Sequence, residues 1–106
     1  MKFGEYAQRA GETAIYPNRG SNLAYAILGL IGEAGELANQ FKKTIRDDGG
    51  DLSVRRDKLA DELGDVLWYC AAVAHEIGID LGAIAAANLA KLAARKDQGT
   101  LKGDAR

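Results

Sequence analysis

Several residue types that mark particular protein classes are scarce in this chain of 106 residues. It has one cysteine, Cys70, so no internal disulfide can form, and this favours a reducing compartment. An excess of positive or negative charge is also lacking, because the formal net charge is only −1. No overall field therefore draws the chain to nucleic acid or to an anionic membrane.

Long apolar runs are missing as well. No stretch approaches the roughly 20 apolar residues of a membrane-spanning helix. The first residues, Met1 to Glu5, turn polar at once and lack the apolar region of a secretory signal. We therefore expect a cytoplasmic protein with neither a membrane nor a nucleic acid as its partner.

Apolar residues recur at helical spacing, and no strand pattern competes with them. The length suits one domain over residues 1–106 with a modest core. We predict an all-α, four-helix bundle-like domain with a central antiparallel helix pair, which assembles into a homo-oligomer because short helices bury little surface alone. The predicted helices cover residues 3–16, 23–46, 53–77 and from 81 to a loose polar tail at 97–106.

The helix boundaries follow from turn and cap residues. Pro17 disfavours a helical conformation at Tyr16, so the first helix is expected to stop there. The segment 47–51 holds acidic residues but lacks the ligand spacing of a calcium loop, and we interpret it as a solvated turn. The expected caps of the later helices are Ser21 or Asn22, Gly78 and Asp80.

Each of the last three helices carries an apolar stripe that we expect to face the core. On the second helix the stripe consists of Leu23, Ile27, Leu30, Ile31, Ala34, Leu37, Ala38, Phe41 and Ile45. On the third it consists of Leu59, Leu63, Val66, Leu67, Cys70, Val73, Ala74 and Ile77. On the fourth it consists of Leu81, Ile84, Ala85, Leu89 and Leu92.

Two acidic pairs interrupt these stripes. Glu33 and Glu36 lie three residues apart on the second helix, and Glu62 and Asp65 lie three apart on the third. Residues at this spacing share a helix face. In an antiparallel hairpin the two pairs have the same rotational sense and lie within about one turn of each other, so we expect them to meet at one edge.

Four neighbouring carboxylates repel one another, and a bound cation removes that cost. One such pair alone is more often a solvated face, but two matched pairs favour a metal site. Oxygen ligands without thiolate or imidazole predict Mg²⁺, with Mn²⁺ as the alternative. A di-iron site would need Glu-x-x-His, and the only histidine, His75, has Ala72 three residues before it.

Glycines recur every third residue on the second helix, at Gly29, Gly32 and Gly35. Each costs up to about 1 kcal/mol relative to alanine in a helix interior. Such a row makes sense where something approaches the backbone closely, either a partner helix or a ligand. Spacing alone leaves both possibilities open.

Around the acidic pairs the sequence resembles the MazG-like family of all-α nucleoside triphosphate pyrophosphohydrolases. The likeness rests on E-x-x-E at Glu33 and Glu36, on E-x-x-D at Glu62 and Asp65, and on the stretches 28–38, 61–69 and 88–92. Many members carry a further glutamate where this chain has Gly32, so one metal contact is absent here or is supplied by another group.

The resemblance implies hydrolysis of nucleoside triphosphates to monophosphate and pyrophosphate, typical of nucleotide-pool housecleaning. It also implies a homodimer or a dimer of dimers. The four carboxylates Glu33, Glu36, Glu62 and Asp65 would be the metal ligands. Alternatively, Glu33 or Glu36 would hold the attacking water as a base, and the other three would bind the metal. The candidate substrate contacts are Lys43, Trp68, Asn88, Lys91 and Arg95.

These substrate contacts carry different weight. A lone lysine or arginine is usually solvated, and an aromatic beside an apolar stripe, such as Trp68, is usually packing. Asn88 falls within the stripe of the fourth helix, where a buried amide needs a partner. Two other functions stay open: a non-catalytic helical oligomerisation module, and the same fold acting on phosphoribosyl-ATP or on deoxyuridine nucleotides.

Overall fold

The computed structural model describes residues 1–101 and 103, which contain no strand. The part of the predicted tail at 102 and 104–106 lies outside the described residues. Among the residues described, no single helix is long and apolar enough to cross a membrane, and the pair α3–α4 passes that test only with a bend of 100°. The elements are α1 (Phe3–Gly11), α2 (Leu23–Asp47), the 3₁₀ turn η1 (Leu52–Val54), α3 (Arg56–Ile77) and α4 (Leu81–Asp97). The all-α prediction is confirmed.

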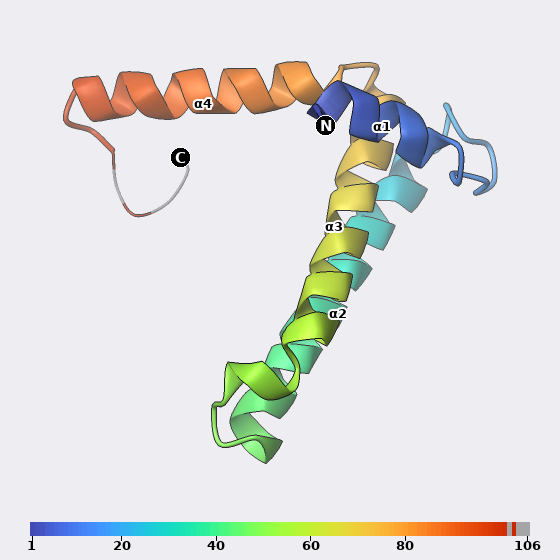
Figure 1. The fold of residues 1–106 in the computed structure, drawn as a ribbon. Helices are drawn as coiled ribbons and strands as arrows, with labels where there is room; N and C mark the ends of the chain where they lie inside the picture. Colours follow the sequence, from blue (N-terminus) through green and yellow to red (C-terminus); the bar gives the residue numbers. More distant parts are fainter. Residues whose placement is uncertain (102, 104–106) are drawn as a thin grey trace.

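The central feature is the predicted antiparallel hairpin of α2 and α3 (Figure 1). Helix α1 lies across the open end of this hairpin, against α3 and the start of α4. Helix α4 then leaves α3 at 100° and extends away from the hairpin. Within one chain the four helices therefore do not close into the bundle that we predicted, because α4 has no second helix along its length.

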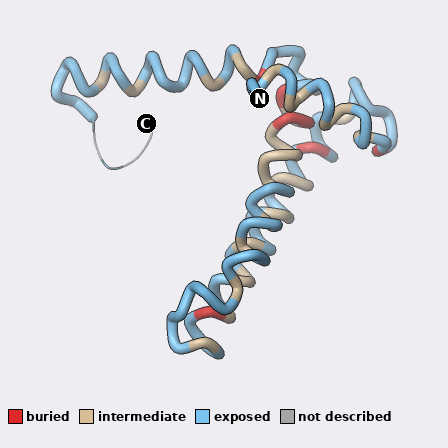
Figure 2. Tube along the Cα trace, viewed as in Figure 1, coloured by how far each residue is buried: buried red, intermediate tan, exposed pale blue. Residues whose placement is uncertain are grey.

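The buried apolar core is small and lies where α1 crosses the hairpin (Figure 2). Alanines dominate it, so the helices approach closely but remove little apolar area from water. The core residues are Tyr16, Ala26, Ala71, Ala72, Ala74 and Leu81.

Much of the predicted core is instead exposed. Ile31 is 62% exposed on α2, Leu63 is 58% exposed on α3, and Leu89 is 68% exposed on α4. Ile84 and Asn88, predicted to face inward on α4, are exposed too. The physical reason is that a two-helix hairpin has only one internal contact face, so the remainder of each stripe is uncovered.

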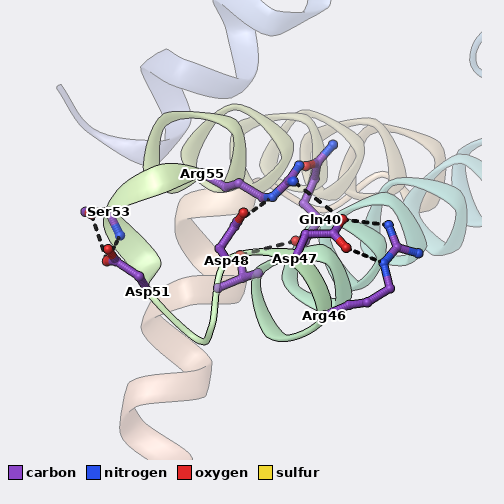
Figure 3. A network of polar contacts seen from close by, with 8 residues as sticks. Gln40, Arg46, Asp47, Asp48, Asp51, Ser53 and Arg55 are labelled. Atoms are coloured by element: carbon purple, nitrogen blue, oxygen red, sulfur yellow. Dashed lines mark hydrogen bonds and ion pairs between the residues drawn. The ribbon is translucent and has the colours of Figure 1, made fainter.

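The turn that joins α2 to α3 fixes how the two helices align (Figure 3). Gly49 and Gly50 adopt φ values of +63° and +83°, which glycine reaches without a steric cost. The carbonyl of the fully buried Thr44 accepts hydrogen bonds from the N–H groups of Asp48 and Gly50. The Arg55 guanidinium donates to the Asp48 carboxylate at 2.7 Å, which ties the start of α3 to the end of α2.

Helix α3 begins later than predicted. We expected its start near Ser53, but Ser53 lies in the 3₁₀ turn and α3 starts at Arg56. The Asp51 carboxylate accepts hydrogen bonds from both the N–H and the hydroxyl of Ser53, and this side-chain cap holds the tighter turn (Figure 3).

The glycine row on α2 serves one close contact inside the chain. A Cβ placed on Gly29 would lie 2.0 Å from a ring carbon of Tyr69, so only glycine fits there. A Cβ on Gly32 or Gly35 would meet nothing within 4 Å. The close approach that we predicted is therefore confirmed at Gly29 alone, where the approaching group is a side chain of α3.

The segment between α1 and α2 is held by side chains from α3. Helix α1 ends at Gly11 rather than near Tyr16, and the indole N–H of Trp68 donates to the Thr13 hydroxyl at 2.9 Å. Further along, the Glu76 carboxylate accepts hydrogen bonds from the backbone N–H groups of Gly20 and Asn22. Trp68 thus fixes the chain just past the end of α1, and Glu76 fixes it just before the start of α2.

The caps of α2, α3 and α4 are confirmed. The Asn22 side chain accepts from the Tyr25 N–H, and the Asp80 side chain accepts from the Ala83 N–H. Gly78 ends α3 with a φ of +72°.

We predict that Glu76 makes folding acid-sensitive. Desolvation opposes its ionisation, but the backbone N–H groups of Asn22 and Gly20 lower the pKa of its carboxyl below the ordinary 4.5. Its contribution to stability is thus present above 4.5 and is lost as the pH falls through the lower folded-state pKa. Glu76→Gln should destabilise the protein at pH 7, and its deficit relative to wild type should shrink on acidification.

Urea denaturation across this pH range measures both free energies of unfolding. The matched control is Glu12→Gln, an exposed site on the same protein. A Glu76→Gln deficit that stays constant with pH would show that the carboxylate charge is not responsible.

Candidate metal and substrate site

The contact between Gly29 and Tyr69 sets the register of the hairpin at the site. Four residues closer to the turn on each helix stand Glu33 and Asp65. Since both helices rise 1.5 Å per residue, these two residues lie on the same level. Glu36 and Glu62 each lie three residues further toward the turn, so these two residues also share a level.

Three of the four predicted carboxylates converge. Each of Glu33, Glu62 and Asp65 offers an oxygen, and these oxygens all lie within 4.8 Å of one another. Glu33 and Glu62 are half-buried and Asp65 is exposed. Glu36 is exposed on α2 and stands outside this group, so the prediction of a four-membered cluster holds for three members.

The cluster is electrostatically strained. Desolvation raises the pKa of Glu62 above its ordinary value, and the negative charges of Glu33, Asp65 and Glu36 raise it further. Glu36 thus acts on Glu62 although it is not among the converging oxygens. A positive charge among these groups would remove both the repulsion and part of the desolvation cost.

The donor set fits a hard divalent cation. All three groups are carboxylates, which suit Mg²⁺ or Mn²⁺ better than softer metals. Since their oxygens lie within 4.8 Å of one another, the three side chains are close enough to share one ion. These three residues would hold the ion, and Glu36 is the neighbouring carboxylate left for another role.

A cleft of about 330 Å³ opens directly beside the carboxylates. Its lining residues are Glu33, Asp65, Thr13, Trp68 and Tyr69. The rings of Trp68 and Tyr69 meet edge to face at 4.9 Å. Trp68, a predicted substrate contact, therefore lines the cleft next to the acidic cluster.

Thr13, which also lines this cleft, is not among the predicted site residues. Its role depends on the indole of Trp68, 55 residues away in the chain, which donates to its hydroxyl. No spacing pattern signals such a distant pair, although a threonine just past a helix end is a common hydrogen-bonding position.

The predicted cationic contacts do not reach the cluster within this chain. Lys43 lies ten residues beyond Glu33, about 15 Å along the helix axis. It lies near Asp47 instead, whose pKa is lowered chiefly by the hydrogen bond from Arg46 and least by the charge of Lys43. Asn88, Lys91 and Arg95 lie on α4, which projects away from the hairpin (Figure 1). The prediction that the Asn88 amide is buried is wrong, because Asn88 is exposed and nothing in the described chain covers that part of α4.

We predict that a divalent cation stabilises the fold through this cluster. Mg²⁺ titrated to 100 times its dissociation constant should add about 2.7 kcal/mol to the free energy of unfolding. Glu62→Gln should raise the thermal midpoint in EDTA, because it removes one repelling charge, and should abolish the Mg²⁺-dependent rise.

Thermal unfolding with and without Mg²⁺ checks both effects, with Glu12→Gln as the control that keeps the cluster intact. An equal Mg²⁺ response in wild type and Glu62→Gln would place cation binding elsewhere.

Known proteins resemble this chain over the region that contains these residues. The family model described as the MazG nucleotide pyrophosphohydrolase domain matches residues 22–100, which include both acidic pairs and α4. The chain is also 45% identical over 104 residues to the Gene 37 protein of Mycobacterium phage L5, with 92% of this chain and 91% of that protein covered. No solved structure matches.

Proposed function

Because the chain belongs to the MazG nucleotide pyrophosphohydrolase family, we propose that it hydrolyses nucleoside or deoxynucleoside triphosphates to a monophosphate and pyrophosphate, with Mg²⁺ as cofactor. The observation that carries this proposal is the convergence of Glu33, Glu62 and Asp65 from two helices onto one point. The adjoining cleft with Trp68 and Tyr69 supplies room for an organic substrate. Such an activity suits the removal of unwanted nucleotides from the cellular pool.

The roles of the residues follow from their places in the cluster. Glu33, Glu62 and Asp65 hold the cation, which when bound neutralises phosphate oxygens and lowers the pKa of a water molecule. Glu36 is exposed beside them and is free to accept the proton of the attacking water. Water oxygen bonds to the α phosphorus, the bond from that phosphorus to the bridging oxygen breaks, and pyrophosphate leaves.

We predict that turnover depends on both the cluster and the cation. Wild-type protein with Mg²⁺ and a nucleotide panel should release pyrophosphate and monophosphate in equal amounts, and EDTA should stop the reaction. Glu36→Gln should lower kcat by roughly 10²–10⁴, the range of general-base catalysis. Asp65→Asn should act mainly on the Mg²⁺ requirement.

The panel includes dUTP and phosphoribosyl-ATP. These two substrates distinguish hydrolysis of nucleoside triphosphates in general from an enzyme specific for deoxyuridine nucleotides or for phosphoribosyl-ATP. Glu12→Gln serves as the control and should keep full activity. Hydrolysis that survives EDTA and Glu36→Gln alike, or no hydrolysis of any substrate, would refute the proposal.

Self-association is the second part of the proposal. The accessible surface is 7423 Å², against about 5,700 Å² for a compact monomer of this mass. The radius of gyration is 16.4 Å, against about 13 Å for a compact domain of this length. The excess of about 1,700 Å² per chain is larger than the roughly 800 Å² that each partner buries in a standard interface and matches the larger interfaces of obligate oligomers, which supports a homodimer or a dimer of dimers.

One face of α2 is the best candidate for this interface. Leu28 and Ile31 are 67% and 62% exposed, and they share a helical face with Gly32 and Gly35, whose Cβ positions are open. Exposed aliphatic side chains beside glycines allow another helix to pack closely against the backbone.

We predict that Ile31→Glu weakens self-association, because it places a charge in an apolar contact. Sedimentation velocity should show the wild type as a dimer or tetramer and Ile31→Glu shifted toward monomer. Leu52→Glu, at an exposed position in the turn between α2 and α3, is the matched control and should not shift. A wild type that sediments as a monomer at all concentrations would contradict the prediction.

A further inference from the structure

A second cleft, of about 290 Å³, continues the one beside the carboxylates. The two share Thr13, Trp68 and Tyr69, so together they form one groove with an acidic end and an aromatic end. Tyr16 and Tyr25 line the aromatic end, and their rings are stacked at 4.8 Å with an interplanar angle of 8°. The groove therefore offers metal-binding oxygens at one end and aromatic rings at the other.

The segment 13–17 contributes Thr13, Ile15, Tyr16 and Pro17 to the lining of this cleft, and it has no regular structure from residue 14 to 16. Within the described residues, the N–H groups of Ile15 and Tyr16 and the carbonyls of Ala14 and Ile15 take part in no hydrogen bond. The segment is nevertheless held at both ends: Thr13 accepts from Trp68, and the Pro17 carbonyl accepts from the Asn22 side chain. A fixed backbone edge with free donors and acceptors can recognise a planar polar ligand.

The side chain of Ile15 adds a third feature. It is 92% exposed, the highest value among the large apolar residues of the described chain, although it lines the cleft. An aliphatic side chain in that place has no packing role in the chain itself. A ligand in the cleft would cover part of it and remove that apolar area from water.

We propose that the segment 13–17 binds the nucleobase of the substrate and sets the base preference of the enzyme. The base lies in the aromatic end, its edge faces the free backbone groups of Ile15 and Tyr16, and the Ile15 side chain covers it. This inference rests on the proposed function, because the triphosphate at the acidic end gives the nucleotide its direction along the groove. A nucleobase is the occupant that fits, since it combines a flat aromatic face with a hydrogen-bonding edge.

The single tryptophan of the chain makes the proposal measurable, because Trp68 lies between the two ends of the groove. Fluorescence and thermal unfolding are recorded with Mg²⁺ and either an α,β-methylene nucleoside triphosphate or inorganic tripolyphosphate, which lacks a base. Both probes should raise the thermal midpoint, but only the nucleotide should change the Trp68 emission. Equal emission changes from both probes, or nucleotide binding without a change, would overturn the base assignment.

The same pair of probes separates this inference from the proposed function. If tripolyphosphate fails to bind with Mg²⁺ while nucleosides alter Trp68 emission, the phosphate end is wrong and the base site stands. If tripolyphosphate binds and no nucleotide differs from it, the phosphate end stands and the base site is wrong.

Substitution of Ile15 tests the role of the segment directly. Ile15→Ala should raise KM about tenfold for the preferred nucleotide with little change in kcat, and should leave tripolyphosphate binding unchanged. Because the side chain is so exposed, the thermal midpoint of the variant should equal that of wild type. Leu52→Ala, another exposed aliphatic truncation, should alter neither constant. An unchanged KM for every nucleotide would reject the assignment.

Discussion

The repulsion among Glu33, Glu62 and Asp65 is the constraint around which this structure is built. Desolvation and the neighbouring carboxylates raise the pKa of Glu62, and three such groups within 4.8 Å cost stability unless a cation joins them. The three groups lie on two helices rather than on loops, so their backbone positions are fixed close together. Such preorganisation is what metal-assisted phosphate chemistry requires, because positioning and charge stabilisation account for most of the catalysis.

Two contacts hold the helices in the alignment that this cluster needs. At the closed end of the hairpin, Arg55 binds Asp48 and the buried Thr44 carbonyl accepts from the turn. Nearer the site, Tyr69 lies against Gly29, where a side chain on α2 would force the helices apart. With the two helices fixed at both points, a slip of one residue would rotate Glu33 away from Asp65 by 100°. The turn and the glycine are thus parts of the site, although neither touches a ligand.

The small core leaves several helix faces uncovered. Most of the buried apolar residues are alanines at one end of the hairpin, while Ile31, Leu63 and Leu89 remain exposed. A single chain therefore carries its acidic cluster on a hairpin with uncovered faces, and α4 carries Asn88, Lys91 and Arg95 away from it. Association of copies, as proposed above, would cover these faces.

The sequence by itself determined the helices, the caps at Asn22, Gly78 and Asp80, the antiparallel hairpin and the meeting of the acidic pairs, because helical periodicity and cap chemistry are local. The early end of α1, the exclusion of Glu36 and the exposure of α4 were decided only by the tertiary structure. Those outcomes depend on how the helices pack, which also brings together residues distant in the chain, such as Trp68 with Thr13 and Glu76 with Gly20. A periodic stripe shows that a helix has an apolar face, but only the packing of the folded chain decides whether anything covers it.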